Sequence, residues 1–104
     1  MAPRGAALAV DRVFARLGRD ALWRQGGIGP GAPVRVIRRA PDRLASFGEG
    51  RFVADAVLLD VRVSEVAQLQ RGDTFEIDGT IHELRSDPVR DSQRLVWAAE
   101  ARAL

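Results

Sequence analysis

The stretch SEVAQLQRGDTFEIDGTIHEL, residues 64–84, decides the fold of this chain. Near its end, Asp78-Gly79 stands between two short runs, Thr74 to Ile77 and Thr80 to Leu84, in which residue character alternates. An Asp-Gly pair between alternating runs is typical of a two-residue type I′ turn that joins antiparallel strands. The stretch therefore predicts a β-hairpin.

A two-residue turn also fixes which residues of the hairpin face one another. It places Ile77 opposite Thr80 and Phe75 opposite His82, and alternate side chains point to opposite faces of a strand. The core face is then expected to hold four side chains: Phe75, Ile77, His82 and Leu84. His82 is the single histidine of the chain. With no partner constellation beside it, we expect a packed, hydrogen-bonded histidine in the core or at its rim, and not a catalytic one.

The residues before the hairpin predict a turn of their own. Ser64, with Val66 and Leu69 three residues apart, indicates a single helical turn with Ser64 as its N-cap. Gly72-Asp73 then turns the chain into the first hairpin strand, because Gly and Asp favour turns. We expect the four turn residues Gly72, Asp73, Asp78 and Gly79 to serve the fold.

The other segments predict one helix and further strands. Residues 6–25 show apolar residues three and four apart, which predicts a helix, although Gly18 allows a break. Residues 26–33, GGIGPGAP, are too rich in Gly and Pro for regular structure and predict a linker. Strand-like alternation recurs over 34–39, within 52–63 and over 94–102.

Taken together, these segments predict a mainly β protein with one N-terminal α-helix. About five or six short strands with tight turns favour a small antiparallel β-barrel or sandwich. We expect a single domain over residues 1–104, in which the barrel occupies 34–104. Within it, residues 40–50 (APDRLASFGEG) form a connection long enough to be a mobile, functional loop.

Composition excludes several classes of protein. The chain of 104 residues has no Cys, which rules out disulfides and thiolate zinc sites, and one His, which rules out a histidine metal cluster. No apolar run is long enough to span a membrane, and the N-terminus lacks a signal-peptide core. We expect a cytoplasmic product without membrane contact, cofactor, metal or catalytic centre.

Charge is placed unevenly along the chain. Residues 1–51 hold ten Arg and four acids (10 − 4 = +6), whereas residues 52–104 hold six Arg and ten acids (6 − 10 = −4). Such polarity suits layered docking of subunits, in which a positive surface meets a negative one. Chance asymmetry on a solvated surface is the alternative.

One run carries a resemblance to a known family. Glu65-Val66-Ala67-Gln68-Leu69-Gln70-Arg71-Gly72-Asp73-Thr74 closely resembles a segment of the head–tail joining (tail attachment, or head completion) proteins of lambda-like phages. Those proteins carry an acid-Val-x-x-Leu-x-x-Gly-Asp run, then a strand, a tight turn and an aromatic-x-aliphatic return strand. Val61-Arg62, Gly48-Glu49-Gly50 and Leu95-Val96-Trp97 also fit the pattern. His82 departs from it, since an aromatic residue is usual there.

The resemblance implies a virion structural protein without catalytic activity. Its subunits would form a ring, a hexamer or dodecamer, in the neck of the particle. That ring would join the portal or adaptor ring of the DNA-filled head to the tail terminator or tail tube. It would act as a stopper after packaging, with packaged DNA in its lumen. Assembly would take place in the bacterial host cytoplasm, for a phage, a prophage or a gene transfer agent.

For partner contacts we single out the loop 40–50 and the arginines near it. Apolar Leu44 and Phe47 either hold that loop to its own domain or contact a partner. The full set of candidates is Arg38, Arg39, Arg43, Leu44, Phe47, Glu49, Arg51 and Arg71. A different class of function remains open: a small barrel that binds nucleic acid through Arg35, Arg38, Arg39 and Arg51.

Overall fold

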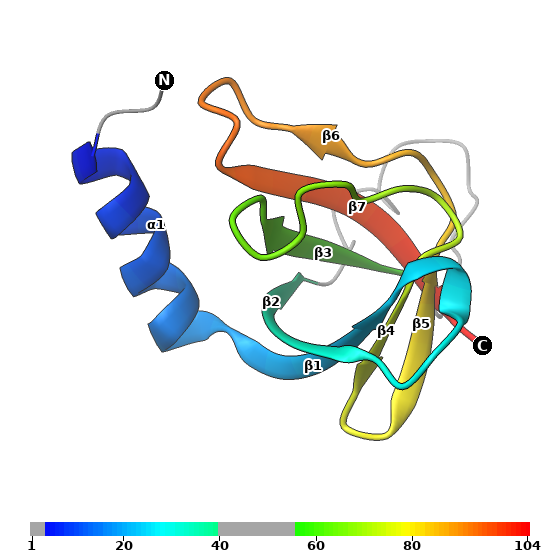
Figure 1. Ribbon diagram of the computed structural model, residues 1–104. Helices are drawn as coiled ribbons and strands as arrows, with labels where there is room; N and C mark the ends of the chain where they lie inside the picture. Colours follow the sequence, from blue (N-terminus) through cyan, green and yellow to red (C-terminus); the bar gives the residue numbers. More distant parts are fainter. Residues whose placement is uncertain (1–3, 40–55) are drawn as a thin grey trace, which may run out of the picture.

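The structure, a computed structural model, describes residues 4–39 and 56–104 (Figure 1). Helix α1 spans Arg4–Leu17 and is followed at once by strand β1. The remaining elements, in chain order, are β1 (Arg19–Arg24), a 3-10 turn η1 (Gln25–Gly27), β2 (Ala32–Arg39), β3 (Ala56–Arg62), β4 (Thr74–Ile77), β5 (Thr80–Leu84), β6 (Val89–Arg90) and β7 (Val96–Ala103).

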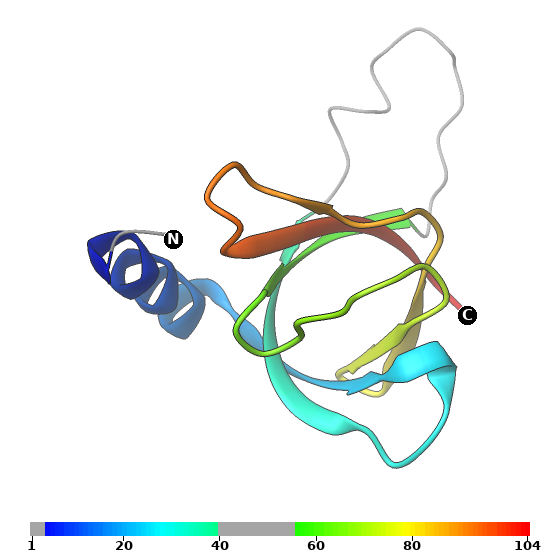
Figure 2. The same cartoon turned by 45° about the horizontal axis from the view of Figure 1, so that its top comes forward.

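The strands close into an antiparallel barrel. Their order is β3-β2-β1-β4-β5-β7, and pairing of β3 with β7 along Ala56 to Arg62 closes the circle. Figure 2 shows these strands running around a ring, with α1 outside it. Strand β6 pairs with β7 as a short addition. The predicted class, a mainly β chain with an N-terminal helix and a small antiparallel barrel, is confirmed.

The core fills the inside of this barrel. Alternate residues point inward, as they must in a pleated strand with one face buried. On β3 these are Val57, Leu59 and Val61, and on β2 they are Val34 and Val36. The largest side chains enclosed there include Phe75, Leu59 and Leu84. Such a core makes the barrel a rigid support for whatever its surface contacts.

The β4–β5 hairpin has the register that its Asp78-Gly79 turn predicted. Ile77 lies opposite Thr80, and Phe75 lies opposite His82. Asp78 and Gly79 both have positive φ, 50° and 82°, as a type I′ turn requires. His82 is 5% exposed, so its expected place in the core is confirmed.

The predicted helix over 6–25 is wrong in its second half. It ends at Leu17, and residues 19–24 form β1, which pairs with both β2 and β4. Gly18 marks the change of direction. A Cβ there would lie 2.4 Å from the Phe14 carbonyl oxygen and 2.8 Å from Cγ of Arg35, so no larger residue fits without a shift. Pairing with two neighbouring strands outweighs the weak helical pattern of this segment.

Other boundaries also move. The predicted linker 26–33 gives its first two residues to η1 and its last two, Ala32 and Pro33, to β2. The barrel therefore begins at Arg19 and not at residue 34. Near residue 64, the N–H groups of Glu65 and Val66 both donate to the Arg62 carbonyl, which makes a turn but no helix. The loop 40–50 lies outside the described residues.

Candidate docking interface

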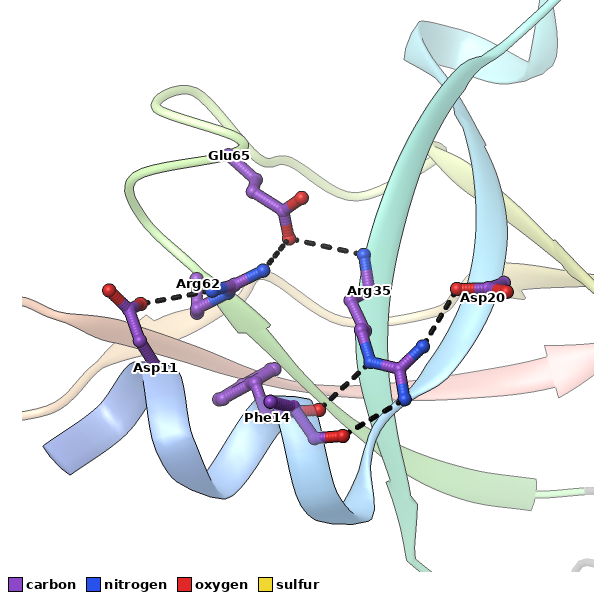
Figure 3. Close-up of polar contacts among 7 residues, drawn as sticks. Asp11, Phe14, Asp20, Arg35, Arg62 and Glu65 are labelled. Atoms are coloured by element: carbon purple, nitrogen blue, oxygen red, sulfur yellow. Dashed lines mark hydrogen bonds and ion pairs between the residues drawn. The ribbon is translucent and has the colours of Figure 1, made fainter. Parts of the chain in front are cut away.

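Helix α1 lies beside the barrel and contacts it mainly along β2 (Figures 1 and 2). Phe14 is its buried anchor, with 3% of its surface exposed. Around Phe14 a polar cluster ties the helix to the barrel. Figure 3 shows its members: Asp11, Phe14, Asp20, Arg35, Arg62 and Glu65.

Arg62, at the end of β3, is the first of two arginines that hold the helix. Its guanidinium lies 5.2 Å from the centroid of the Phe14 ring. Nη1 lies 2.9 Å from Asp11 and Nη2 lies 2.9 Å from Glu65. Burial by itself lowers the pKa of Arg62, but the bonds to the two carboxylates outweigh it and raise that pKa above its ordinary value. Arg62 therefore stays charged and joins helix, strand and turn.

Arg35, on β2, is the second. Its Nε donates to the Phe14 carbonyl at 3.0 Å, and Nη2 donates to the Ala15 carbonyl at 3.2 Å. The last carbonyl groups of a helix lack partners within it and attract positive charge. Asp20 accepts a hydrogen bond from Nη1 at 2.8 Å, which fixes the guanidinium in this position. Arg35 thus caps the end of α1.

The predicted interface residues fall into two groups. Arg43, Leu44, Phe47, Glu49 and Arg51 lie outside the described residues. Of the others, Arg38 and Arg39 end β2, where they are exposed.

The described candidates are not brought together. Arg38 lines a surface hollow with His82 and Asp78, at the turn end of the β4–β5 hairpin. Arg71 lines a different hollow with Gly72 and Arg85, at the open end of that hairpin. Arg38 and Arg71 therefore lie at opposite ends of the barrel and do not form one surface.

Asp73, one of the predicted turn residues, is the centre of a buried hydrogen-bonded cluster. Asp73 is 1% exposed, and its carboxylate accepts three hydrogen bonds. The donors are Nε1 of Trp23 at 3.1 Å, the Gly26 N–H at 2.9 Å and the Gln70 N–H at 3.2 Å. Gly72 beside it has a φ of 95°, a left-handed value that favours glycine. These contacts tie β1, η1 and the start of β4 into one unit.

His82 stays neutral at the pH where a free histidine begins to titrate. Burial lowers its pKa, and the positive charge of Arg38 lowers it further, against the opposing effect of backbone bonds at Phe75 and Thr80. Its Nδ1 is buried without a protein partner among the described residues. Among the described residues that line its hollow, the carboxylate is that of Asp78, which is paired with Arg19, and the hydroxyl is that of Thr80.

Ion pairs connect the two halves of the sequence and so remove much of their charge difference. Three arginines before residue 40 each meet an acid after residue 55 at 2.9 to 3.0 Å. The pairs are Arg19 with Asp78, Arg24 with Glu76, and Arg39 with Asp60. The sequence polarity therefore does not become two oppositely charged faces in the part of the chain that the structure describes.

Surface residues that the sequence did not single out lie on α1. Leu8, Val13 and Leu17 are 55%, 46% and 62% exposed. The sequence signal was available in the apolar spacing of residues 6–17, but a helix laid flat on a sheet would have hidden these side chains. Their exposure follows from the sideways attachment of α1.

Within 4–39 and 56–104 there is no group of three or more His, Cys, Asp or Glu side chains placed to hold a metal ion. The helical part of the same ranges contains no segment of the length and apolarity needed to cross a membrane.

Comparison with known proteins gives one family. The phage head-tail attachment protein family matches residues 3–101, almost the whole chain. No curated protein sequence matches this chain. The match includes the run over residues 65–74 on which the resemblance was based. It covers α1, strands β1 to β6 and all but the last two residues of β7. The chain therefore belongs to the phage head-tail attachment protein family.

Proposed function

We propose that this chain is a subunit of the neck of a tailed phage or phage-like particle, where it joins the DNA-filled head to the tail. The observation that carries the proposal is the family match over residues 3–101 on a closed barrel. Copies of the chain assemble into a ring, a hexamer or dodecamer. The ring acts as a stopper between the portal or adaptor ring and the tail terminator or tail tube.

The barrel suits such work because it is rigid and leaves no long open sheet edge among its six closing strands. A ring needs subunits that keep their shape while their surfaces are covered. The chain acts through those surfaces and catalyses no reaction. The particle is that of a phage, a prophage or a gene transfer agent, and packaged DNA lies in the lumen of the ring.

Within this proposal the loop 40–50 contributes contacts to the neighbouring rings. Its candidates are Arg43, Leu44, Phe47, Glu49 and Arg51. Arg38 and Arg39, which end β2 just before it, extend this surface. Arg71, at the opposite end of the barrel, serves a separate contact. One ring with contacts at both barrel ends can join two different partners.

A deletion and complementation experiment tests the proposed function. A strain without this gene is expected to produce separate heads and tails, because the joining step fails, and its heads are expected to lose DNA, because the stopper is missing. Adding the purified protein to a mixture of the two is expected to restore joined particles, counted by electron microscopy. Joined particles formed without the protein would contradict the proposal.

The nucleic-acid alternative is less well supported. Of its four arginines, Arg35 caps α1 and Arg39 is paired with Asp60 at 2.9 Å, so two are committed within the fold. Tight binding to DNA with a steep dependence on salt concentration would favour the alternative. Weak binding in low salt, together with incorporation into particles, favours the neck subunit.

A further inference from the structure

Helix α1 carries more apolar surface than the barrel covers. Phe14 is buried, whereas Leu8, Val13 and Leu17 are 55%, 46% and 62% exposed. Large apolar side chains that gather on one exposed element commonly mark a contact with another protein. This surface lies within the described residues and is separate from the loop 40–50 and from Arg71.

Helical geometry gives this surface a definite pattern. At about 100° per residue, Val13 and Leu17 share one side of α1, since they are four residues apart. Arg12 and Arg16 share the adjacent side, between the directions of Val13 and Leu8. All five are exposed. The outer face of α1, which we define as Leu8, Arg12, Val13, Arg16 and Leu17, is therefore apolar with a basic stripe.

The charge of this outer face is not neutralised by α1 itself. The helix has one acidic residue, Asp11, and its carboxylate is bound to Arg62 on the barrel side at 2.9 Å. In the described part of the chain no ion pair involves Arg12 or Arg16. A partner of this face should therefore offer apolar contact and acidic groups together.

The described part of a second copy of the chain offers few such groups. In the described ranges, seven carboxylates are ion-paired: Asp11, Asp20, Asp60, Glu65, Glu76, Asp78 and Glu83. Asp73 is buried, and Asp91 accepts the N–H groups of Leu95 and Val96. Only Asp87 and Glu100 of these ranges remain, which is a poor rim for a docking site. Nucleic acid fits no better, because it supplies negative charge without an apolar surface for Val13 and Leu17.

We propose that the outer face of α1 docks into an apolar groove with an acidic rim on a different protein of the neck. The inference rests on the proposed function, and it names the element that makes one of the joints. Val13 and Leu17 enter the groove, while Arg12 and Arg16 meet the acidic rim. Arg62 and Arg35 hold α1 to the barrel, so that the load on this joint reaches the ring.

The probes for the test are the two particles that a strain lacking this gene would provide: unjoined heads and isolated tails. Each is mixed with purified protein and sedimented, and the bound protein is measured. Two variants change the outer face: Val13→Gln with Leu17→Gln, and Arg12→Glu with Arg16→Glu. Gln and Glu are good helix formers, so α1 is expected to persist, which circular dichroism verifies.

Matched controls make the same changes on the barrel. Ile81→Gln with Val89→Gln replaces two exposed apolar residues, which are 38% and 68% exposed. Arg90→Glu with Arg102→Glu repeats the charge reversal on strands β6 and β7. Because docking contacts concentrate their energy in few residues, each outer-face variant should bind heads or tails at least ~10-fold more weakly than wild type. The controls should stay within about twofold.

Other outcomes would overturn the docking inference alone, or both that inference and the proposed function. Wild-type protein that binds one particle, with outer-face variants that bind equally well, overturns this inference and leaves the proposed function standing. Wild-type protein that binds neither particle overturns both. A self-association of the wild type in sedimentation that Val13→Gln with Leu17→Gln abolishes would make the occupant a second copy and so overturn the inference. DNA binding lost in Arg12→Glu with Arg16→Glu, with head and tail binding unchanged, would also overturn it.

Discussion

The guanidinium of Arg62 lies over the ring of Phe14, 5.2 Å from its centroid, and thereby joins the end of strand β3 to the last turn of helix α1. A cation above an aromatic face is attracted by the ring's electrons. The same guanidinium binds Asp11 of the helix and Glu65 of the following turn. Arg62 therefore contributes to the position of α1 beside the barrel, together with the buried Phe14 and with Arg35 at the end of the helix.

Removing the charge of Arg62 should therefore release α1. In Arg62→Met the apolar stem is kept, but the bonds to Asp11 and Glu65 and the contact with Phe14 are lost. Hydrogen exchange of the α1 amides is expected to become at least ~10-fold faster, since local opening then costs less free energy. The amides of β4 and β5 should exchange as before. Arg85→Met, which removes an exposed pair with Glu83, is the control. Unchanged α1 protection in Arg62→Met would contradict this role.

The hairpin turn depends on left-handed backbone at Gly79. Its φ is 82°, and a β-branched residue at such an angle is strained. Gly79→Val should lower the unfolding free energy by about 1–3 kcal/mol, measured by urea denaturation. Gly79→Asn is the matched control, because Asn tolerates positive φ, and its cost should be clearly smaller. Equal midpoints for Val and Asn would show that the backbone angle is not the cause.

Asp73 should matter for folding and not for docking. Asp73→Ala leaves three donors, from Trp23, Gly26 and Gln70, without their acceptor in a buried site. Unsatisfied buried donors are costly, and we expect a loss of about 3 kcal/mol or more in unfolding free energy. Asp87→Ala, at an exposed position, should change it by no more than about 0.5 kcal/mol. A similarly small effect of Asp73→Ala would show that the hydrogen bonds to Asp73 contribute little to stability.

His82 predicts a pH dependence with a definite sign. Burial and Arg38 lower its pKa in the folded state, so the unfolded chain binds the proton more readily. The stability that neutral His82 contributes is complete above the unfolded pKa of about 6.5 and is lost as pH falls through the folded value. The unfolding free energy should therefore decrease from about pH 7 to 5.

The variant His82→Phe isolates this effect, because the chain has no other histidine. Phe keeps an aromatic ring opposite Phe75 but cannot titrate. The unfolding free energy of the variant minus that of wild type should increase as the pH falls from about 7 to 5, because only wild type loses stability through His82. If the variant value minus the wild-type value stays constant with pH, or decreases toward acid, the pKa of His82 is not lowered.

Much of the barrel could be predicted because its signals are local. Asp78-Gly79 has a composition that fits only a few turns, and it fixed the register of Phe75 and His82. The alternation within residues 52–63 likewise predicted a strand, and β3 lies there with Val57, Leu59 and Val61 buried. Each of these rests on neighbours within a few residues.

The failures have the opposite cause. Strand β1 looks helical by itself, and it is a strand because β2 and β4 lie on either side of it. Strand β6 has two residues and exists through its pairing with β7. The tie between Arg62 and Asp11 joins residues 51 positions apart, and nothing in their local sequence marks it. Contacts of that range decide where α1 lies, and with it which side chains remain exposed.

The most direct test of the central claim is the structure of the neck in purified particles by electron cryo-microscopy. The account predicts a ring of copies of this six-stranded barrel between the portal or adaptor ring and the tail, with α1 of each copy against a neighbouring protein. Absence of the protein from purified particles, or density for it anywhere other than the head–tail junction, would contradict the account.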